Sequence, residues 1–324
     1  MSLENKVVLL TGGTGSFGQK FTENVLKNYR PRAIRIFSRG ELLQWEMNQK
    51  FGNEPRLRFL IGDVRDKDRV FRAMNGVDIV VHAAALKQVP ACEYNPIEAV
   101  KTNVDGTTNV IDAAIENGVE KVIGISTDKA VHPVNLYGAT KMVMERLLTQ
   151  ANVYTGGRRT RFSCTRYGNV IGSRGSVVPL FFEQRKTGSI TITDTRMTRF
   201  WLTLNQGVNF VINSLEKMNG GEIFIPKIPS TKIIDLASVI APEAKVNITG
   251  IRPGEKLHEV LLTEDEARHA KEFKEYFIIE PEYSFWNSND SEGSTSLPEG
   301  FSYTSENNTS WLTGDCLKEA IREH

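Results

Sequence analysis

The chain has 324 residues, with 40 Lys and Arg against 39 Asp and Glu, a formal net charge of +1 and 40% hydrophobic residues. This length can bury a sizeable core, and the near-neutral charge offers no basic field for nucleic acid or an anionic membrane. With a mean hydropathy of −0.30 and apolar runs no longer than a strand, the sequence predicts no transmembrane helix, which would need roughly 20 apolar residues.

The first residues lead directly into an apolar strand pattern without a signal-peptide or transit-peptide pattern, so we expect a cytoplasmic protein. Cys92, Cys164 and Cys316 are odd in number and widely spaced, which favours reduced thiols over a disulfide framework or a zinc site. Cys92 and Cys164 fall in predicted element interiors and are expected to pack there. The five histidines show no metal-ligand spacing, and we expect no metal.

From residue 6 to about residue 167, short apolar runs rich in β-formers alternate with longer amphipathic stretches. The predicted strands are 7–11, 33–37, 57–61, 79–83, 122–126 and 161–167. The predicted helices are 16–26, 40–51, 67–74, 96–117 and 137–154. Such alternation is typical of repeated βα units, so we expect an α/β fold with a Rossmann-like, doubly wound parallel sheet of six strands.

After residue 168 the alternation gives way to short mixed segments with more Pro and Gly, which predict a smaller mixed α/β portion that binds substrate. Residues 284–310 are rich in Ser, Asn, Glu and Gly and predict an extended excursion. Apolar residues at helical spacing from 311 to 321 predict a helix that docks on the body or on a neighbouring subunit. We therefore expect a nucleotide-binding domain at 1–167, a substrate-binding domain at 168–283 and a tail with a terminal helix at 284–324.

A glycine-rich loop follows the first predicted strand and opens directly into a helical pattern. Glycine allows the backbone to turn tightly and to approach a pyrophosphate, which then lies at the positive end of the helix. A glycine triplet alone is weak evidence for a dinucleotide site, but here a predicted strand precedes the loop and a predicted helix follows it, as such a site requires. The predicted dinucleotide-binding residues of the loop are Gly12, Thr14, Gly15, Ser16, Phe17 and Gly18.

The second predicted strand ends in Ser38 and Arg39, where NAD sites usually carry an acidic residue for the ribose 2′-hydroxyl. A hydroxyl and a guanidinium suit a 2′-phosphate, so we expect NADP rather than NAD, a solvated surface arginine being the alternative. Asp63 and Val64, just after the third strand, are expected to meet the adenine, although Asp63 could instead cap the next helix.

The fifth predicted strand leads into Thr127, Asp128 and Lys129, and a Tyr137-x-x-x-Lys141 pattern follows on a predicted helix. A Tyr and a Lys four residues apart share one helix face, so the ammonium can lower the pKa of the phenol and hold the nicotinamide ribose. This pattern predicts Tyr137 as a base for a substrate hydroxyl, with Thr127 supplying a hydrogen bond to the same oxygen.

This set of residues resembles the extended short-chain dehydrogenase/reductase superfamily over nearly the whole chain. Its sugar-nucleotide members include 4-epimerases and 4,6-dehydratases, and retaining dehydratases carry Asp-Glu where this chain has Asp128-Lys129. Elimination of water needs a base for the C5 proton and an acid for the C6 hydroxyl. We expect Lys129 to be the base, with a depressed pKa, and Asp128 the acid, with a raised one. The two roles could be exchanged, or the pair could titrate as a unit.

Five further stretches are similar to the inverting UDP-N-acetylglucosamine 4,6-dehydratases of bacterial pseudaminic acid biosynthesis: 82–87, 135–138, 166–170, 196–201 and 252–256. A sister group carries Met at the position of Tyr137. The resemblance implies a closed NADP cycle in which hydride leaves C4, water is lost from C5 and C6, hydride returns to C6 and C5 is inverted. The product would be UDP-2-acetamido-2,6-dideoxy-β-L-arabino-hex-4-ulose.

The same resemblance implies further site residues and a homo-oligomer. Ala83 and Val170 would contact the cofactor. The expected ligands of UDP-N-acetylglucosamine, with the arginines facing the diphosphate, are Lys87, Asn169, Arg199 and Arg252. Gly40 departs from the family, which more often has an acidic residue after Ser-Arg.

Two other functions remain open at this point. One is a UDP-hexosamine 4-epimerase, or a dehydratase/5-epimerase of other stereochemistry, in surface polysaccharide synthesis; epimerisation leaves the mass of the sugar unchanged, whereas dehydration removes water. The other is a non-catalytic NADP-binding sensor. The intact set from Thr127 to Lys141 disfavours a sensor, because a sensor needs the glycine loop but no acid, base or Tyr-Lys pair.

Overall fold

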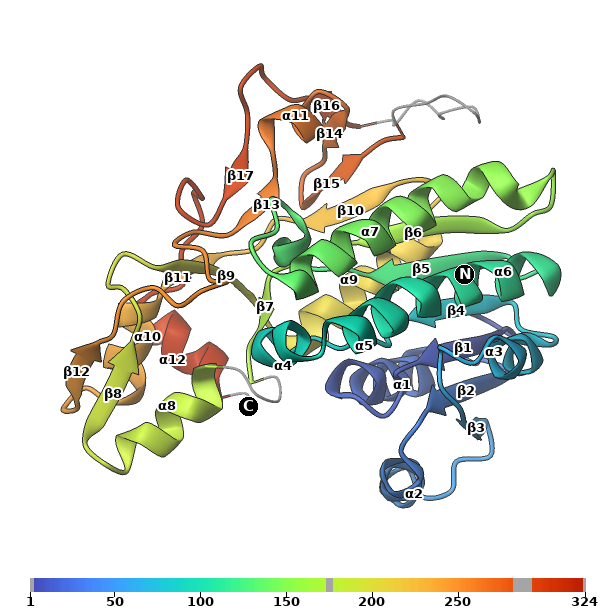
Figure 1. Ribbon diagram of the computed structural model, residues 1–324, viewed down its shortest axis with the longest axis horizontal. Coiled ribbons are helices and arrows are strands. Elements are labelled where there is room, and N and C mark those ends of the chain that lie inside the picture. Colours follow the sequence, from blue (N-terminus) through green and yellow to red (C-terminus); the bar gives the residue numbers. More distant parts are fainter. Residues whose placement is uncertain (1–2, 173–176, 282–292, 323–324) are drawn as a thin grey trace.

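A computed structural model describes residues 3–172, 177–281 and 293–322 (Figure 1). Its centre is a ten-stranded sheet of order β16-β14-β15-β10-β6-β5-β4-β1-β2-β3. The strands are β1 (Val7–Thr11), β2 (Ala33–Ser38), β3 (Leu57–Ile61), β4 (Ile79–His82), β5 (Lys121–Ile125), β6 (Arg161–Thr165), β10 (Ile223–Pro226), β14 (Ala270–Glu272), β15 (Tyr276–Ile279) and β16 (Thr295–Ser296).

All six predicted strands form, each within two residues of its predicted bounds, and each pairs in parallel with its neighbours. Every residue of β1 and β4 is buried, as expected where helices cover both faces of a parallel sheet. The sheet is larger than predicted, because later segments return to it. β10 adds a parallel strand beside β6, and β15, β14 and β16 extend the edge in antiparallel fashion.

Helices flank the sheet on both faces, with α3 against α6, α6 against α7, and α1 against α9 from the second half of the chain. Their bounds are α1 (Ser16–Asn28), α2 (Glu41–Lys50), α3 (Lys67–Met74), α6 (Gly106–Glu116), α7 (Leu136–Gln150) and α9 (Leu204–Lys217). The single helix predicted at 96–117 is α5 (Pro96–Val100), a π-helical turn (Lys101–Asp105) and α6. A further helix, α4 (Val89–Tyr94), was not predicted; it carries Pro90 in its first turn, where proline is tolerated.

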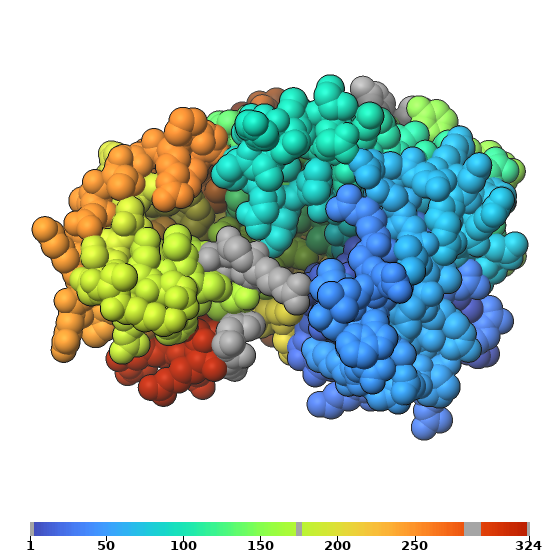
Figure 2. Space-filling view, turned by 60° about the horizontal axis from the view of Figure 1, so that its bottom comes forward, coloured from blue at the N-terminus to red at the C-terminus, as the bar shows by residue number. Residues whose placement is uncertain are grey.

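A smaller lobe packs around its own apolar core beside the main body, and Figure 2 shows a hollow between the two. Helices α8 (Val177–Arg185), α10 (Ile233–Ile240) and α12 (Gly314–Arg322) and the pair β8 (Ser189–Ile192) and β12 (Lys245–Ile248) build this lobe. The predicted terminal helix is α12, which docks on α10 and buries Leu317 and Ile321. A three-stranded sheet, β11 (Ser230–Lys232), β9 (Thr198–Leu202) and β7 (Asn169–Val170), lies between lobe and body.

The boundary predicted at 167/168 is a change of sequence pattern, but the main body continues beyond it, since α9 and β10 belong to its core. In the predicted excursion, the described part is anchored: β17 (Tyr303–Thr304) pairs with β13 (Val260–Leu262). The buried Tyr303 hydroxyl donates to the carbonyl of Ile228 at 2.7 Å. The main core therefore recruits residues from both ends of the chain.

Cys92 and Cys164 are free and fully buried, in α4 and β6, which confirms the packing role predicted for them. Within the described residues, no helix is long and apolar enough to cross a bilayer.

Candidate active site

The glycine loop joins β1 to α1 at the carboxyl edge of the sheet. Gly12 has a φ of +67°, and a Cβ there would lie 2.9 Å from the backbone of Ala84, so both conformation and space require glycine. Gly15 is the N-cap of α1, and no side chain of the described residues caps this helix. Ser16, Phe17 and Gly18 form its first turn, whose N–H groups are therefore available to an anion.

A cavity of about 420 Å³ opens beside this loop. It gathers predicted cofactor residues from three segments: Gly12, Thr14, Ser38, Arg39, Asp63 and Val64. The nearby N–H groups of Ala83 and Ala84 donate to Thr11 Oγ1 at 3.2 Å and so fix the end of β4 beside the loop.

Asp63 supplies the negative charge that balances Arg39 and Arg65 beside this cavity. Burial would raise the pKa of its carboxyl, but Arg65, and to a smaller extent Arg39, lower it below the usual value. Arg39 Nη1 lies 3.8 Å from Asp63 Oδ2, and the arginine side chain is 57% exposed. Asp63 does not cap the next helix, because Asp66 caps α3 by accepting from the N–H of Arg69.

The Tyr-Lys pair lies at the start of α7, where Asn135 caps the helix by accepting from the N–H of Gly138 at 2.8 Å. Lys141 Nζ donates to the carbonyl of Ile125 at the end of β5, and burial lowers its pKa to about 8. Burial raises the pKa of Tyr137 to about 12, and the cation that opposes this rise is Lys129. The lowering that we predicted from Lys141 is not found, because its ammonium is directed to β5.

Asp128 and Lys129 form a short 3₁₀ turn directly after β5. Thr127 Oγ1 and Lys129 Nζ both donate to Asp128 Oδ1, each at 2.9 Å. Asp128 is fully buried, and its other oxygen, Oδ2, accepts no hydrogen bond from the described residues. The hydroxyl, carboxylate and ammonium that the sequence predicted to act together therefore lie in direct contact.

The ionisation of Lys129 differs from the prediction. Burial disfavours its ammonium, but the carboxylates of Asp128 and Glu259 outweigh burial and raise the pKa of Lys129 above its usual range. The depressed pKa predicted for a basic amine is not found in this ion-paired arrangement. The reason is a second carboxylate from a segment 130 residues further along the chain, which the local Thr-Asp-Lys pattern could not indicate.

Three of the four predicted substrate ligands have unsatisfied or available groups. Asn169 Oδ1 in β7 is buried without a hydrogen-bond partner among the described residues, and Val170 beside it is half-buried. Lys87 has a pKa lowered by burial and by Lys129. Arg252 is 57% exposed and lies 4.0 Å from Glu255.

Arg199 is placed differently from the other three. It is 8% exposed, and its guanidinium donates to the backbone carbonyls of Thr198 at 2.7 Å, Leu257 at 3.1 Å and Lys256 at 3.0 Å. Most of its donors are therefore committed to the chain itself. Its geometry fits a residue that holds the 256–257 turn better than one that faces a diphosphate.

Sequence reasoning missed three residues of this centre. Glu259 faces Lys129 at 3.9 Å, Gly138 packs on the Lys129 carbonyl, and Asn135 donates to the carbonyl of Gly254 at 2.8 Å. The signal for Glu259 was its position three residues after Lys256, a spacing that favours an ion pair. The other two lie in the 135–138 stretch that resembles the dehydratases, but their contacts depend on the fold.

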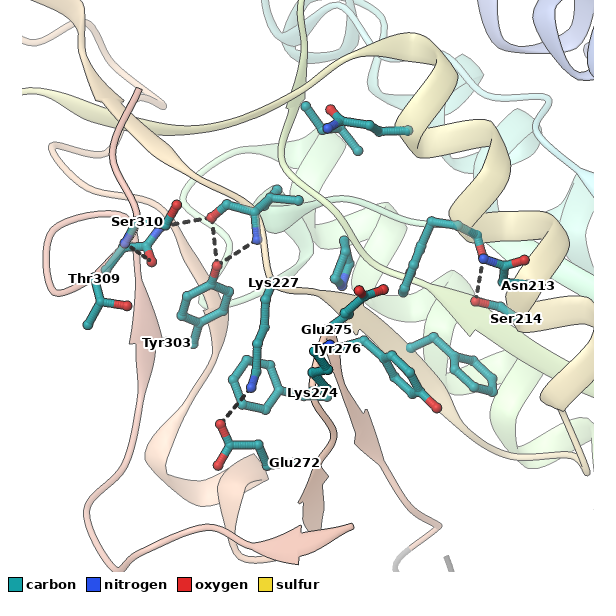
Figure 3. Close-up of a pocket in the computed structure, with 18 of the residues that line it drawn as sticks. Asn213, Ser214, Lys227, Glu272, Lys274, Glu275, Tyr276, Tyr303, Thr309 and Ser310 are labelled. Carbon is teal, nitrogen blue, oxygen red and sulfur yellow. Dashed lines mark hydrogen bonds and ion pairs between the residues drawn. The ribbon is translucent and has the colours of Figure 1, made fainter. Parts of the chain in front are cut away.

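A larger hollow of about 980 Å³ lies between α9, the β10–β15 edge and residues 300–310 (Figure 3). Lys227 pairs with Glu272 at 2.7 Å within it, and Tyr303 lines its wall. None of the predicted catalytic residues lines this hollow. The larger hollow therefore lies apart from the residues predicted to be catalytic.

The chain is similar to proteins of known name over nearly its full length. It is 52% identical over 325 residues to a protein named UDP-N-acetylglucosamine 4,6-dehydratase (inverting) of Campylobacter jejuni, covering 98% of this chain and 97% of that protein. It is 45% identical over 284 residues to a UDP-glucose 4-epimerase of Rickettsia canadensis, covering 85% and 83%. The X-ray structure of Pen from Bacillus thuringiensis superposes over all of both chains with a TM-score of 0.90 and 41% identity.

The family model of the polysaccharide biosynthesis proteins matches residues 8–281, which span the glycine loop, the Thr-Asp-Lys turn, the Tyr-Lys helix and the segment that carries Glu259. Together with the parallel sheet and its helices, this match confirms the predicted Rossmann-like fold. The chain belongs to the polysaccharide biosynthesis protein family and has a Rossmann-like fold.

Proposed function

We propose that this protein is an inverting UDP-N-acetylglucosamine 4,6-dehydratase that forms UDP-2-acetamido-2,6-dideoxy-β-L-arabino-hex-4-ulose for pseudaminic acid biosynthesis. The observation that carries the proposal is the buried acid-base pair next to the Tyr-Lys helix, with Lys129 Nζ 2.9 Å from Asp128 Oδ1. The Campylobacter relative, of nearly the same length, bears this dehydratase activity in its name.

In this reaction Tyr137 takes the proton of the C4 hydroxyl, and the Thr127 hydroxyl turns its single hydrogen from Asp128 Oδ1 to the same oxygen. The phenol is protonated at neutral pH when its pKa is about 12, so it needs a neighbouring cation to act as a base. Lys129 is that cation, since it opposes the rise in the pKa of this phenol.

Elimination then needs a basic group at C5 and a proton for the C6 hydroxyl. A proton passed from the Lys129 ammonium to Asp128 within their 2.9 Å ion pair makes both groups neutral. It leaves an amine that can accept the C5 proton and a carboxylic acid that can protonate the departing hydroxyl, which leaves as water. This transfer reconciles the assigned roles with the raised pKa of Lys129.

The loop and cavity fit a nicotinamide dinucleotide, which we propose to be NADP. Such a cofactor, when bound, supplies the hydride acceptor at C4 and the hydride donor at C6. Its phosphates would lie at the uncapped N-terminus of α1, the adenine near Asp63 and Val64, and a 2′-phosphate near Ser38 and Arg39.

The cofactor proposal is tested by binding measurements on Arg39→Ala. Loss of the guanidinium is expected to weaken NADP binding about tenfold or more while leaving NAD binding nearly unchanged, because only NADP carries the 2′-phosphate. Equal losses for both cofactors would contradict the assignment of Arg39.

A second candidate function is a 4-epimerase, which the name of the Rickettsia relative favours. Epimerisation needs only the redox cycle at C4 and no base for C5. The buried Asp128–Lys129 pair would have no use in that reaction, and burying two charges costs free energy that only a function or good hydrogen bonding offsets. The pair therefore favours the dehydratase.

We further propose that the protein acts in the cytoplasm as a homo-oligomer. Exposed apolar side chains gather on α4, α5 and α7, which contact one another. Tyr94 is 87% exposed, Ile97 63%, Met142 39% and Val143 37%. A face of this kind is typical of a protein–protein contact.

The experiment that tests the function is mass spectrometry and NMR of the products formed from UDP-N-acetylglucosamine in D₂O without added cofactor. The expected product has lost water, carries deuterium at C5 and has the L-arabino configuration. An unchanged mass with a galacto product would establish an epimerase. No conversion by protein that retains bound NADP would support another substrate or a sensor.

A further inference from the structure

A third charged residue, Glu259, lies against the Asp128–Lys129 pair. Glu259 precedes β13 and is 3% exposed. Its carboxylate faces Lys129 Nζ at 3.9 Å, Arg199 Nε at 3.6 Å and Lys256 Nζ at 3.7 Å. Its Oε2 atom is buried and accepts no hydrogen bond from the described residues. A buried carboxylate surrounded by cations at these distances acts by its charge rather than by directed hydrogen bonds.

The backbone holds Glu259 rigidly in this position. Its N–H donates to Ser305 Oγ at 2.9 Å, and its carbonyl accepts from the N–H of Ser305 at 2.8 Å. Ser305 Oγ in turn lies 2.7 Å from Thr198 Oγ1, next to Arg199. The carboxylate therefore approaches Lys129 from a segment far from residues 127–129 in sequence but fixed to them in space.

The neighbouring lysine of the same segment fixes the other side of the catalytic turn. Lys256 Nζ donates to the carbonyl of Val131, just after the 3₁₀ turn that carries Asp128 and Lys129. Lys129, Lys256 and Arg199 form a group of three cations around Glu259. Without the charge of Glu259, a single carboxylate, that of Asp128, would remain to offset all three. Like charges at such distances repel strongly when buried.

We propose that Glu259 is a positioning residue that holds the Lys129 ammonium against Asp128 and so prepares the acid-base pair. The catalytic consequence of this role, though not the positioning itself, rests on the proposed dehydratase function. Removal of the charge frees Lys129 from one of its two carboxylates. The amine then loses its proton at lower pH and moves away from Asp128.

The ionisation of Lys129 depends on every charged or titratable group around it, so the test must hold the others constant. Apart from Glu259, the groups that act on Lys129 or respond to it are Asp128, Tyr137, Lys87, Arg199 and Lys256. Glu259→Gln changes none of these and preserves the size of the side chain. Glu264→Gln, on the exposed start of α11 (Glu264–Ala267), removes the same charge five residues away and is the matched control.

The experiment is trace labelling of the full-length protein with acetic anhydride over a range of pH, with Lys129 modification read by peptide mass spectrometry. We expect the midpoint for Lys129 to fall by about one pH unit or more in Glu259→Gln and to stay in place in Glu264→Gln. Glu259→Asp, which withdraws the carboxylate by one methylene, should give a smaller fall and serves if the Gln variant does not fold. An unmoved midpoint in a folded Glu259 variant would overturn the proposal.

The same proteins are then incubated with UDP-N-acetylglucosamine in D₂O. If the wild type forms the dehydrated sugar, Glu259→Gln should form it about tenfold more slowly or worse, with thermal stability close to that of the control. Equal rates in the two variants would overturn the proposal. If the wild type forms no dehydrated sugar while the Lys129 midpoint moves, the dehydratase function fails and the positioning of Lys129 by Glu259 stands.

Discussion

Gly138 allows the two catalytic segments to touch. A Cβ at this position would overlap the carbonyl oxygen of Lys129, so only glycine lets the first turn of α7 pack directly on the turn after β5. The absence of a side chain at Gly138 thus sets the distance between Tyr137 and the Asp128–Lys129 pair.

We expect Gly138→Ala to lower product formation by about 100-fold or more, because the added methyl pushes Lys129 away from Tyr137 while α7 still forms. Product mass spectrometry gives the rate, and far-UV circular dichroism reports the helices. Ala139→Gly is the control: it weakens the same turn of helix by about 1 kcal/mol but adds no contact, so activity should persist. Normal turnover by Gly138→Ala would refute this view of the contact.

Lys141 makes stability depend on pH. Its pKa in the folded protein is about 8, against 10.5 for the free side chain, because burial disfavours the ammonium. Between these values the unfolded chain binds more protons than the folded one, so the free energy of unfolding rises as the pH rises through this window. Below it the protein carries the full cost of the buried charge, on the order of 3 kcal/mol.

This cost is measured by comparing the wild type with Lys141→Met in urea unfolding at pH 7.5 and at pH 10.5. The stability difference between them should shift in favour of the wild type by about 3 kcal/mol at the higher pH, since other titrating groups cancel in the difference. A difference that does not vary with pH would mean that Lys141 titrates normally in the folded protein.

At the residue scale, the sequence predicted which side chains meet but not how they ionise. Thr127, Asp128 and Lys129 are adjacent in the chain, so a strand end brings them together with little dependence on the rest of the fold. The direction of the Lys141 ammonium and the carboxylate of Glu259 depend on tertiary packing, and both changed the predicted pKa values.

At the element scale, one buried ion cluster ties the catalytic helix to the strand beside it. Arg166, which follows β6, donates to both oxygens of Glu145 on α7, at 2.9 and 2.7 Å, and of Glu266 on α11, at 2.9 and 2.8 Å. The guanidinium is 3% exposed. Four hydrogen bonds from a single side chain therefore hold α7 and α11 against the end of β6.

Arg166→Met should lower the free energy of unfolding by about 3–5 kcal/mol, because it leaves two carboxylates buried without their cation. Arg196→Met is the matched control: its pair with Asp194 has a similar length, 2.7 Å, but the arginine is 69% exposed. Loss of this exposed pair should lower the free energy of unfolding far less, because solvent screens it. Urea unfolding measures both, and similar losses for the two variants would show that burial does not decide the strength of the pair.

Elements with a clear pattern of apolar residues were predictable from the sequence, and those without such a pattern were not. The six parallel strands from β1 to β6 are short runs rich in apolar residues, separated by helices. The strands β10, β14, β15 and β16 have two to four residues each, and their pairing joins segments from residue 223 to residue 296. Such short strands gain their stability from neighbours distant in sequence, which no local pattern reports. The helix predicted at 96–117 was right in extent but its π-helical turn was not foreseen.

At the scale of the whole molecule, Asn135 joins the lobe-side segment to the catalytic helix. Its Oδ1 caps α7 and its Nδ2 donates to the carbonyl of Gly254, so one amide side chain serves two partners. The bond to Gly254 closes the 252–259 segment over the catalytic turn.

Asn135→Asp separates these two roles, because an aspartate retains the capping oxygen but loses the donor. We expect the thermal midpoint to change by only a few degrees, and kcat/KM for the sugar nucleotide to fall about tenfold, the worth of one hydrogen bond left unmade. Asn135→Ala loses both roles and should also lower the thermal midpoint further. An unchanged kcat/KM in Asn135→Asp would mean that the contact with Gly254 does not serve catalysis.

The two apolar cores are built from interleaved stretches of chain. Residues 178–197, 233–241 and 317–321 contribute to the smaller core, whereas residues 202–228 and 261–279 return to the larger one. A protease nick in one connecting loop would therefore leave a particle that stays whole on a native gel and separates only on denaturation. For the same reason the smaller lobe cannot be transplanted from one relative to another as a single stretch of sequence. On the proposed function, a change of sugar preference would come through individual substitutions that both cores tolerate.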